Sequence, residues 1–335
     1  MAQRRLTKRQ RQRIAKLQED RRKRLSQKVE QALLCTGDSD TRNGRVISRH
    51  GQHLLIRDEE GKNHHCLFRQ NLGEIVCGDW VLWQAASDDQ GVVVSLLPRK
   101  TVLSRPDYSG RDKPLVANIT QLVVVLAPKP APTGYLTDQY LVAAELIGVK
   151  ALITLNKADL LDPEAWRAFQ QRFSYYQAIG YPLVGVSAHR EHGLEPLLEK
   201  LSNETSILVG QSGVGKSSLI NALIPQQDET VGQLSEASGL GRHTTSVATL
   251  HFLDNGGEII DSPGVRSFRL GKITRQQLEK GFREFAPYLG KCQFSNCTHN
   301  SEPGCALVEA MNQGAIHPDR LNNFLHMAAQ LGKSR

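Results

Sequence analysis

A glycine-rich stretch near the middle of the chain reads Gly210-Gln211-Ser212-Gly213-Val214-Gly215-Lys216-Ser217-Ser218. It matches the pattern G-x-x-x-x-G-K-S/T and directly follows the apolar run 206–209, which is typical of a buried strand. Glycines suit such a loop because consecutive backbone N–H groups must curl around a phosphate. They do so in backbone conformations in which a Cβ would clash. The stretch therefore predicts a strand, a phosphate-binding loop and a helix, rather than a glycine-rich turn that carries a surface lysine.

The last residues of this stretch have distinct expected roles. Lys216 is expected to reach the β- and γ-phosphates of a nucleotide, and the Ser217 hydroxyl is expected to coordinate Mg²⁺. The helix that follows adds the positive end of its dipole at the same place. These features predict a nucleoside triphosphate site, but they do not distinguish ATP from GTP.

A second motif indicates the base. The apolar run 151–155 ends in Asn156-Lys157-Ala158-Asp159, which matches the N-K-x-D element of GTPases. The Asp159 carboxylate can accept hydrogen bonds from the guanine N1 and N2 hydrogens, whereas adenine cannot pair that way. We expect Lys157 to lie along the base and Asn156 to tie this segment to the phosphate loop. A helix-capping aspartate would explain Asp159 alone, but together with the phosphate loop the motif favours guanine.

Two shorter elements fit the same site. Asp261-Ser262-Pro263-Gly264 follows the run 258–260 and is similar to the D-x-x-G of a second switch. In that element Asp261 would hold Mg²⁺ through water, and the Gly264 amide would sense the γ-phosphate. Ser187-Ala188 ends the strand predicted at 183–186 and is similar to the S-A-K element whose backbone touches guanine, although His189 replaces the usual lysine.

The order of these elements is unusual. N-K-x-D normally follows D-x-x-G, but here Asn156 precedes the phosphate loop. A circular permutation explains this order, because the same strands can surround the same nucleotide when the chain is cut elsewhere and the domain termini lie close together. The second switch then leads directly into the C-terminal segment, which is expected to respond to the nucleotide state.

Strands and helices are expected to alternate in the region 119–274, which we assign to the nucleotide-binding domain. Apolar runs predict buried strands at 121–127, 151–155, 183–187, 206–209, 249–253 and 258–260. Helical periodicity lies between several of them, at 136–146, 163–178, 193–201 and 217–223. Strands joined by helical crossovers pair in parallel, so the pattern predicts a mostly parallel α/β sheet.

The N-terminal part has a different pattern. Alternating runs at 45–47, 53–57, 78–83 and 91–94 are separated by turn-forming segments. About five short strands in this region suggest a small β-barrel, with an OB-fold as the leading candidate and a plain spacer barrel as the alternative. We assign the barrel to 36–100. The Pro-containing segment 101–118 is interpreted as a linker.

The positive charge is concentrated in one short segment. The chain has a net charge of +8, but residues 1–30 carry twelve Lys and Arg against three Asp and Glu, so the remainder is nearly neutral. Residues 1–35 are therefore expected to be a basic tail, either simply solvated or binding a polyanion through phosphates. This distribution argues against a protein that coats DNA with a uniformly basic surface.

A cluster of metal-ligand residues lies near the C-terminus. Cys292, Cys297, His299 and Cys305 give the spacing C-x₄-C-x-H-x₅-C, and three thiolates with one imidazole form a complete tetrahedral Zn²⁺ set. This predicts a structural zinc site in a helical domain at 275–335. Free thiols in a loop are the alternative, and His317 and His326 are further candidates for the fourth ligand. Cys35, Cys66 and Cys77 lack such spacing and are expected to be buried apolar residues.

Taken together, these motifs resemble one family, the circularly permuted GTPases known as RsgA or YjeQ. The resemblance covers about 36–335 and implies an OB-fold barrel, a circularly permuted P-loop GTPase domain and a C-terminal α-helical zinc domain. It also implies GTP hydrolysis, slow in the free protein and stimulated by the small (30S) ribosomal subunit, during late maturation of that particle. The implied partners are GTP or GDP and the small subunit with its rRNA, and the implied cofactors are Zn²⁺ and Mg²⁺.

The resemblance extends to the first switch. Residues 239–246 are similar to the family's first switch, in which a threonine contacts Mg²⁺ and the γ-phosphate; Thr244 and Thr245 are both candidates. After D-x-x-G many GTPases place a glutamine that orients the attacking water, but this chain has Val265. We hypothesise that His243 orients the water once the ribosomal subunit orders the loop. The alternative is that His243 only packs or solvates the switch.

Composition and the lengths of the apolar runs indicate where in the cell the protein is expected to act. No apolar run approaches the length of a membrane span and no secretory signal pattern is present. We expect a cytoplasmic monomer without a membrane partner, whose cysteines stay reduced. The rival to the enzyme is a binding module in which GTP is only a structural ligand, and an ATP-dependent enzyme is the third hypothesis.

Overall fold

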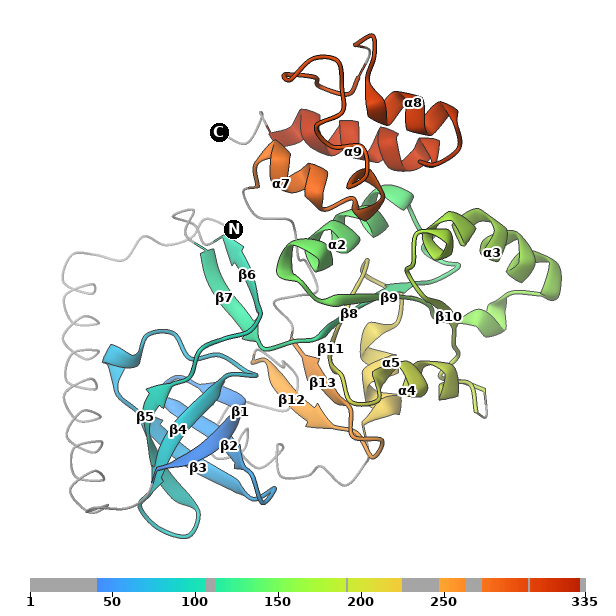
Figure 1. Cartoon of the computed structure of the whole chain (residues 1–335). Helices are drawn as coiled ribbons and strands as arrows, with labels where there is room; N and C mark the ends of the chain where they lie inside the picture. Colours follow the sequence, from blue (N-terminus) through green and yellow to red (C-terminus); the bar gives the residue numbers. More distant parts are fainter. Residues whose placement is uncertain are drawn as a thin grey trace, which may run out of the picture. The chain divides into compact units, whose positions relative to one another are not determined.

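The computed structural model describes residues 41–106, 112–190, 192–224, 247–262, 273–300 and 302–331. The chain divides into two compact units between Pro98 and Arg99 (Figure 1). The basic tail, Cys35 and the switch residues His243, Thr244, Thr245, Gly264 and Val265 lie outside the described residues. Within the described ranges, no helix is long and apolar enough to cross a membrane.

The N-terminal unit is a five-stranded barrel. Its strands are β1 (Arg42–His50), β2 (His53–Asp58), β3 (Asn63–Phe68), β4 (Trp80–Ala85) and β5 (Gln90–Leu96), and η1 (Gln70–Leu72) follows β3. The strand order is β1-β2-β3-β5-β4, β3 pairs with β5 in parallel, and β1 pairs with β4 to close the barrel. This Greek-key closure confirms the predicted OB-fold. Its interior is filled by a cluster that includes Val46, Ile56, Val81, Trp83 and Val93.

The segment 101–118 is a correction to the sequence-based expectation of a linker. Strands β6 (Val102–Pro106) and β7 (Asp112–Ala117) pair as an antiparallel hairpin that belongs to the second unit. Leu103 and Val116 at its base are fully buried. Pro106 and Pro114 drew the linker interpretation, but a two-stranded hairpin consists only of edge strands, which tolerate proline.

The second unit is built on a six-stranded sheet. Its strands are β8 (Gln121–Leu126), β9 (Lys150–Leu155), β10 (Leu183–Gly185), β11 (Thr205–Val209), β12 (Thr249–Phe252) and β13 (Glu258–Asp261). Their order is β10-β9-β8-β11-β13-β12, and every neighbouring pair is parallel except β12 with β13. The mostly parallel sheet is confirmed. The carboxyl ends of β8, β9, β11 and β13 share one edge, where ligands bind in open α/β sheets.

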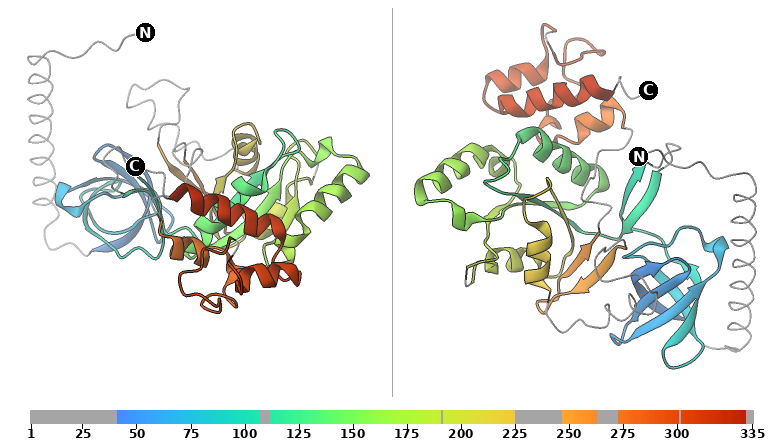
Figure 2. Two further views of the ribbon diagram at one scale, coloured as in Figure 1. Left: turned by 90° about the horizontal axis from the view of Figure 1, so that it is seen from above. Right: turned by 180° about the vertical axis from the view of Figure 1, so that it is seen from behind.

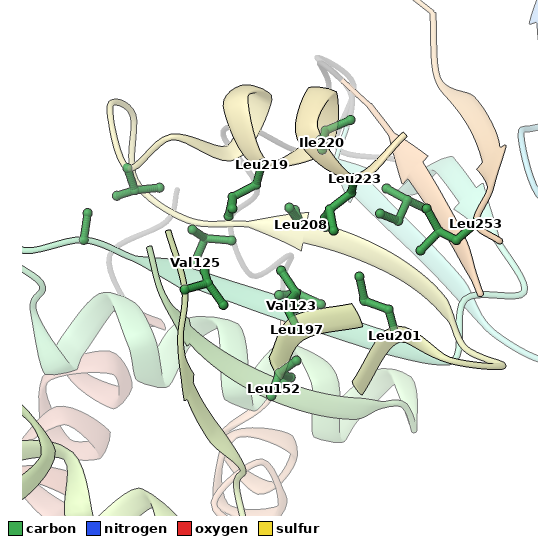
Figure 3. Packing of buried hydrophobic residues seen from close by; sticks show 14 residues of the cluster. Val123, Val125, Leu152, Leu197, Leu201, Leu208, Leu219, Ile220, Leu223 and Leu253 are labelled. Carbon is green, nitrogen blue, oxygen red and sulfur yellow. The ribbon is translucent and has the colours of Figure 1, made fainter. Parts of the chain in front are cut away.

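Helices cover both faces of this sheet. On one face, α4 (Glu195–Leu201) and α5 (Lys216–Leu223) pack over the strands, and Leu197, Leu201, Leu219 and Leu223 meet strand residues such as Val123 and Leu208 in a buried cluster (Figure 3). The opposite face is covered by α2 (Gly134–Ile147) and α3 (Pro163–Ala178) (Figure 1). Alternation along β8 sends Leu122 and Val124, both fully buried, toward that face.

The C-terminal part is helical and rests on α2. It contains α7 (Arg275–Lys280), η5 (Arg283–Phe285), α8 (Ala306–Asn312) and α9 (Pro318–Leu331). Helices α7 and α9 lie against α2 (Figure 2). The core of this part includes Phe282, Phe285, Phe324 and Val142, the last of which comes from α2. The helical domain is therefore packed on the nucleotide-binding domain through a shared helix.

Candidate functional site

The phosphate loop follows β11 without an intervening residue and has the backbone that its glycines allow. Gly210, Gly213 and Gly215 have φ values of 146°, 86° and 92°, which other residues rarely adopt. A Cβ on Gly210 would overlap the carbonyl oxygen of Val125, and a Cβ on Gly215 would overlap the Asn156 amide. Glycine at these positions is thus required both by conformation and by space.

Lys216 begins α5 and folds back over its own loop. Its side chain is buried with the residue 8% exposed, and its Nζ donates hydrogen bonds to the carbonyl oxygens of Gly210 (2.7 Å) and Gln211 (2.8 Å). The positive charge consequently lies within the curl of backbone N–H groups, where it attracts a phosphate. Ser217, next along the helix, is exposed and available to a bound cation.

The N-K-A-D segment lies directly beside this loop. Asn156 Nδ2 donates a hydrogen bond of 2.9 Å to the Val214 carbonyl oxygen, although the two residues are 58 positions apart. Lys157, with φ of 59°, donates from Nζ to the carbonyl oxygen of Gly213 at 2.8 Å. The buried Oδ1 of Asn156 has no hydrogen-bond partner within the described ranges. The two motifs therefore form one surface at the carboxyl edge of the sheet.

Asp159 is held by the S-A element. The Ser187 hydroxyl donates a 2.6 Å hydrogen bond to Asp159 Oδ1, and this bond is the main reason why the pKa of Asp159 is lowered. Ser187 Oγ in turn accepts a hydrogen bond from the His189 backbone N–H at 3.2 Å. Ser187 is buried and Asp159 is half-buried. The carboxylate thus stays charged at neutral pH.

Asp261 is the last residue of β13, which pairs in parallel with β11. It therefore lies at the same edge as the phosphate loop.

The loop after β8, from Ala127 to Thr133, was not predicted to belong to the site. It lies beside the N-K-A-D segment, since Lys157 Nζ donates a hydrogen bond to the Lys129 carbonyl oxygen at 3.5 Å. Pro130 and Pro132 line a small space together with Gly210 and Gln211. The proline-rich composition after a buried strand was the only signal for this loop in the sequence.

The predicted metal ligands also meet. The ligand atoms of Cys292, Cys297, His299 and Cys305 all lie within 4.8 Å of one another. His299 Nδ1 is 3.5 Å from Cys292 Sγ and 3.4 Å from Cys305 Sγ, close to the separation of about 3.5 Å expected around a tetrahedral Zn²⁺. These residues therefore fit a metal ion. His317 and His326, the alternative ligands, lie outside the cluster: His317 stacks on Tyr175, and His326 lies tilted against Tyr135 with its ring centre 4.7 Å away.

The surroundings of the cluster support metal binding. His299 is only 6% exposed, and its Nε2 faces Glu279 Oε1 at 3.6 Å, so a carboxylate fixes the ring with Nδ1 toward the sulfur atoms. Burial raises the pKa of the Cys297 thiol to about 12, and the sulfur atoms of Cys305 and Cys292 add to the effect. A thiol must lose its proton to solvent before its thiolate can bind a metal ion, so metal affinity would fall as the pH falls. Cys66 and Cys77, in contrast, are buried in the barrel, as predicted.

Comparison with known proteins agrees with this geometry. The family described as RsgA GTPase matches residues 96–271. The chain belongs to the RsgA GTPase family. It is 45% identical to the small ribosomal subunit biogenesis GTPase RsgA of Alcanivorax borkumensis, over 99% of this chain and 97% of that protein. The protein of the same name from Azotobacter vinelandii is also 45% identical, over 99% and 98% of the two chains.

Solved structures show the same architecture. YjeQ from Thermotoga maritima superposes with a TM-score of 0.74 and 33% identity, covering 88% of this chain and all of that one. YloQ, a circularly permuted GTPase, superposes with a TM-score of 0.71 at 24% identity, covering 88% and 96% of the two chains, and shows the shared fold. As a member of the RsgA GTPase family, the chain is a GTP hydrolase, and such enzymes work with Mg²⁺.

Proposed function

We propose that this GTPase binds the small ribosomal subunit in the cytoplasm and hydrolyses GTP there during late maturation of that subunit. The proposal is supported by relatives that match nearly the whole chain and are named small ribosomal subunit biogenesis GTPases. The observation that carries the GTP site is the hydrogen bond from Asn156 to Val214, because it joins the base-reading and phosphate-binding segments of a permuted chain. The protein acts as a monomer without a membrane partner.

The nucleotide site has the following proposed roles. Asp159 reads guanine N1 and N2, Lys157 lies along the base, and the backbone of Ala188 approaches the base from the other side. Residues 210–218 wrap the phosphates, with Lys216 neutralising the charge that develops on the β- and γ-phosphates. Ser217 and Asp261, with Thr244 or Thr245, hold Mg²⁺, which when bound neutralises the phosphate oxygens.

Hydrolysis by the free protein is expected to be slow because Val265 cannot orient water. We propose that His243 supplies this function when the subunit orders the first switch, while the Gly264 amide senses the γ-phosphate. His243→Ala should lose the stimulation but keep the affinity for GDP. Full subunit-stimulated turnover in His243→Ala would assign His243 to packing alone.

The metal bound by the C-terminal cluster is proposed to be a structural Zn²⁺. Three thiolates and one imidazole suit Zn²⁺ and leave no open coordination position, so the ion stabilises the fold rather than taking part in hydrolysis. Metal analysis of protein purified without added metal should give one zinc per chain. Iron in place of zinc, or no metal, would contradict this assignment.

The basic tail is proposed to bind rRNA without sequence preference. Each phosphate contact contributes about 0.7 to 0.9 to the slope of log affinity against log salt concentration. Deletion of residues 1–30 should therefore weaken RNA binding and flatten that slope. An unchanged slope would show that the tail makes no phosphate contact.

One experiment tests the central proposal. Single-turnover GTP hydrolysis is measured while purified small subunits are titrated into the full chain, with large subunits as the matched control. An increase in rate that saturates only with small subunits supports a subunit-dependent GTPase. A rate that does not respond would favour the rival, a binding module for which GTP is a structural ligand. Competition by GDP but not by ADP excludes the ATP-dependent alternative.

A further inference from the structure

Helix α2 contacts the phosphate loop on one side. Thr133 caps the first turn of α2. Leu136 lies one turn after Thr133 and Tyr140 lies two turns after it, and both residues line the small space beside Gly210 and Gln211. Tyr140 is 4% exposed and lines this space together with Gly210; burial raises the pKa of its hydroxyl, and a polar contact with the Gly210 backbone opposes that rise. The position of the first glycine in the loop is therefore tied to the position of α2.

The opposite side of α2 is buried under the helical domain. Asp138 is fully buried, and its Oδ1 accepts from Arg320 Nη1 (2.6 Å) and from the Tyr176 hydroxyl (2.7 Å), while its Oδ2 accepts from Asn323 Nδ2 (2.7 Å). One turn further along α2, Val142 joins the core of the helical domain. A Cβ on Gly281 would overlap the Val142 side chain, so the two segments are in close contact.

Arg320 is the centre of this interface. It is 1% exposed, and its other edge binds Glu284 in a bidentate manner, with Nε to Oε1 at 2.6 Å and Nη2 to Oε2 at 2.9 Å. Burial alone would lower the pKa of Arg320, but Asp138 and Glu284 outweigh it and the net direction is upward. A buried pair of this kind is costly to break, because one charge is left without its partner.

The metal cluster rests on the same core. Cys305 belongs to that core, and Cys292 and Cys297 pack against it. The His299 ring lies 6.0 Å from Phe324, which is one helical turn after Arg320 on α9. A continuous set of contacts thus runs from the metal ligands through α9 and Arg320 to α2, and from α2 to the phosphate loop.

We infer that α2 couples the metal cluster to the nucleotide site, with Asp138 and Arg320 as the positioning pair that joins them. The inference rests on the proposed function, since it needs both a nucleotide and a metal to bind. The metal orders the helical domain, the domain holds α2 through Arg320, and α2 holds the phosphate loop through Tyr140. Each ligand therefore raises the affinity for the other by the same factor.

The test is a reciprocal binding measurement on the full chain. The dissociation constant of a fluorescent GDP analogue is measured for zinc-loaded and zinc-free protein, and the affinity for Zn²⁺ is measured against a chromophoric chelator with and without GDP. The expected result is a change of about five-fold or more in both affinities, by equal factors. Affinities that change less than about two-fold would overturn the inference. Zinc-loaded protein that binds no guanine nucleotide would instead refute the proposed function.

Variants locate the coupling. The triple change Asp138→Leu, Glu284→Leu and Arg320→Met replaces the charged cluster with apolar residues and strands no buried charge. This variant should keep one zinc per chain, but zinc should no longer change its affinity for GDP, and GDP should no longer change its affinity for zinc. Lys280→Met, an exposed cation in the same domain, is the matched control and should keep it.

A second variant tests the other end of the path if the triple variant does not fold. Tyr140→Phe removes only the hydroxyl that meets Gly210 and leaves the metal ligands untouched. The factor by which zinc raises the affinity for GDP should become smaller, while the affinity for Zn²⁺ in the absence of GDP stays the same. An unchanged factor in Tyr140→Phe would overturn the inference.

Discussion

The Asn156 amide nitrogen lies 2.9 Å from the Val214 carbonyl oxygen, and the same amide occupies the space that a Cβ on the next residue, Gly215, would need. The phosphate loop and the N-K-A-D segment are therefore fitted to each other by one hydrogen bond and by the absence of a side chain at Gly215. This contact joins segments that are 58 positions apart in the sequence. Any change that fills the space should act on both loops together.

Gly215→Ala tests this fit. The substitution introduces a Cβ at φ of 92° and pushes the Asn156 amide away from Val214, so we expect a loss of about 1–3 kcal/mol in stability and weaker GDP binding. Gly148→Ala is the control, since Gly148 has φ of 79° but open space around it. It should lose only stability, by roughly 1–2 kcal/mol. Equal GDP affinities in the two variants would contradict the proposed fit.

Lys216→Met should remove most of the affinity for nucleotide. The ammonium group lies at the Gly210 and Gln211 carbonyl oxygens, within the curl of the loop. A hydrogen bond to a charged group contributes about 1.5–3 kcal/mol, so the dissociation constant for GTP should rise about 10- to 100-fold. Isothermal titration calorimetry measures this change. Lys200→Met, on the exposed end of α4, should bind GTP as the unaltered chain does.

Asp159→Asn should change the choice of base. An amide in place of the carboxylate cannot accept both guanine hydrogens, so GTP affinity should fall by about 100-fold or more. Xanthosine triphosphate carries a carbonyl in place of the guanine amino group and should bind the variant better than GTP does. Retention of GTP preference in competition assays would show that Asp159 does not read the base.

Ser187→Ala should weaken guanine binding and change its response to acid. The Ser187 hydroxyl lowers the pKa of Asp159, so the carboxylate, for which we propose guanine binding, stays charged above this lowered pKa and is protonated only as the pH falls through it. Without the hydroxyl the pKa rises, and GDP affinity should begin to fall at a higher pH. Ser174→Ala is the control, because the Ser174 hydroxyl donates to a carbonyl oxygen in its own helix. The GDP affinity of this variant should fall with pH as it does in the unaltered chain.

Periodicity and motifs predicted the nucleotide-binding domain well because its strands are continuously apolar and its helices are regular. The predicted helix 163–178 coincides with α3, where Asp162 caps the first turn and Pro163 starts it. Glycine spacing located the phosphate loop for the same reason, since its positive φ values demand that residue. Local chemistry was sufficient in these segments.

Elements that depend on distant contacts could not be predicted in this way. Strand β3 begins with polar residues because His64 turns inward and packs on the Trp83 ring at 4.3 Å. The hairpin of β6 and β7 was hidden by its prolines. Arg320 and Asp138 belong to no motif, and their partnership becomes visible only when α9 folds onto α2.

Removal of the metal should destabilise the helical domain selectively. Cys305 is a proposed metal ligand and also a member of the domain core, so Cys305→Ser should release the metal and loosen the packing around Phe324. Loss of a structural metal is among the changes that cost ~4 kcal/mol or more. For a unit of this size, that corresponds to a melting temperature lower by roughly 10 °C. Cys66→Ala in the barrel core is the control, and it should keep one metal ion per chain although the barrel loses a buried sulfur. A full metal content in Cys305→Ser, or an unchanged thermal transition after chelation, would contradict a structural role for the cluster.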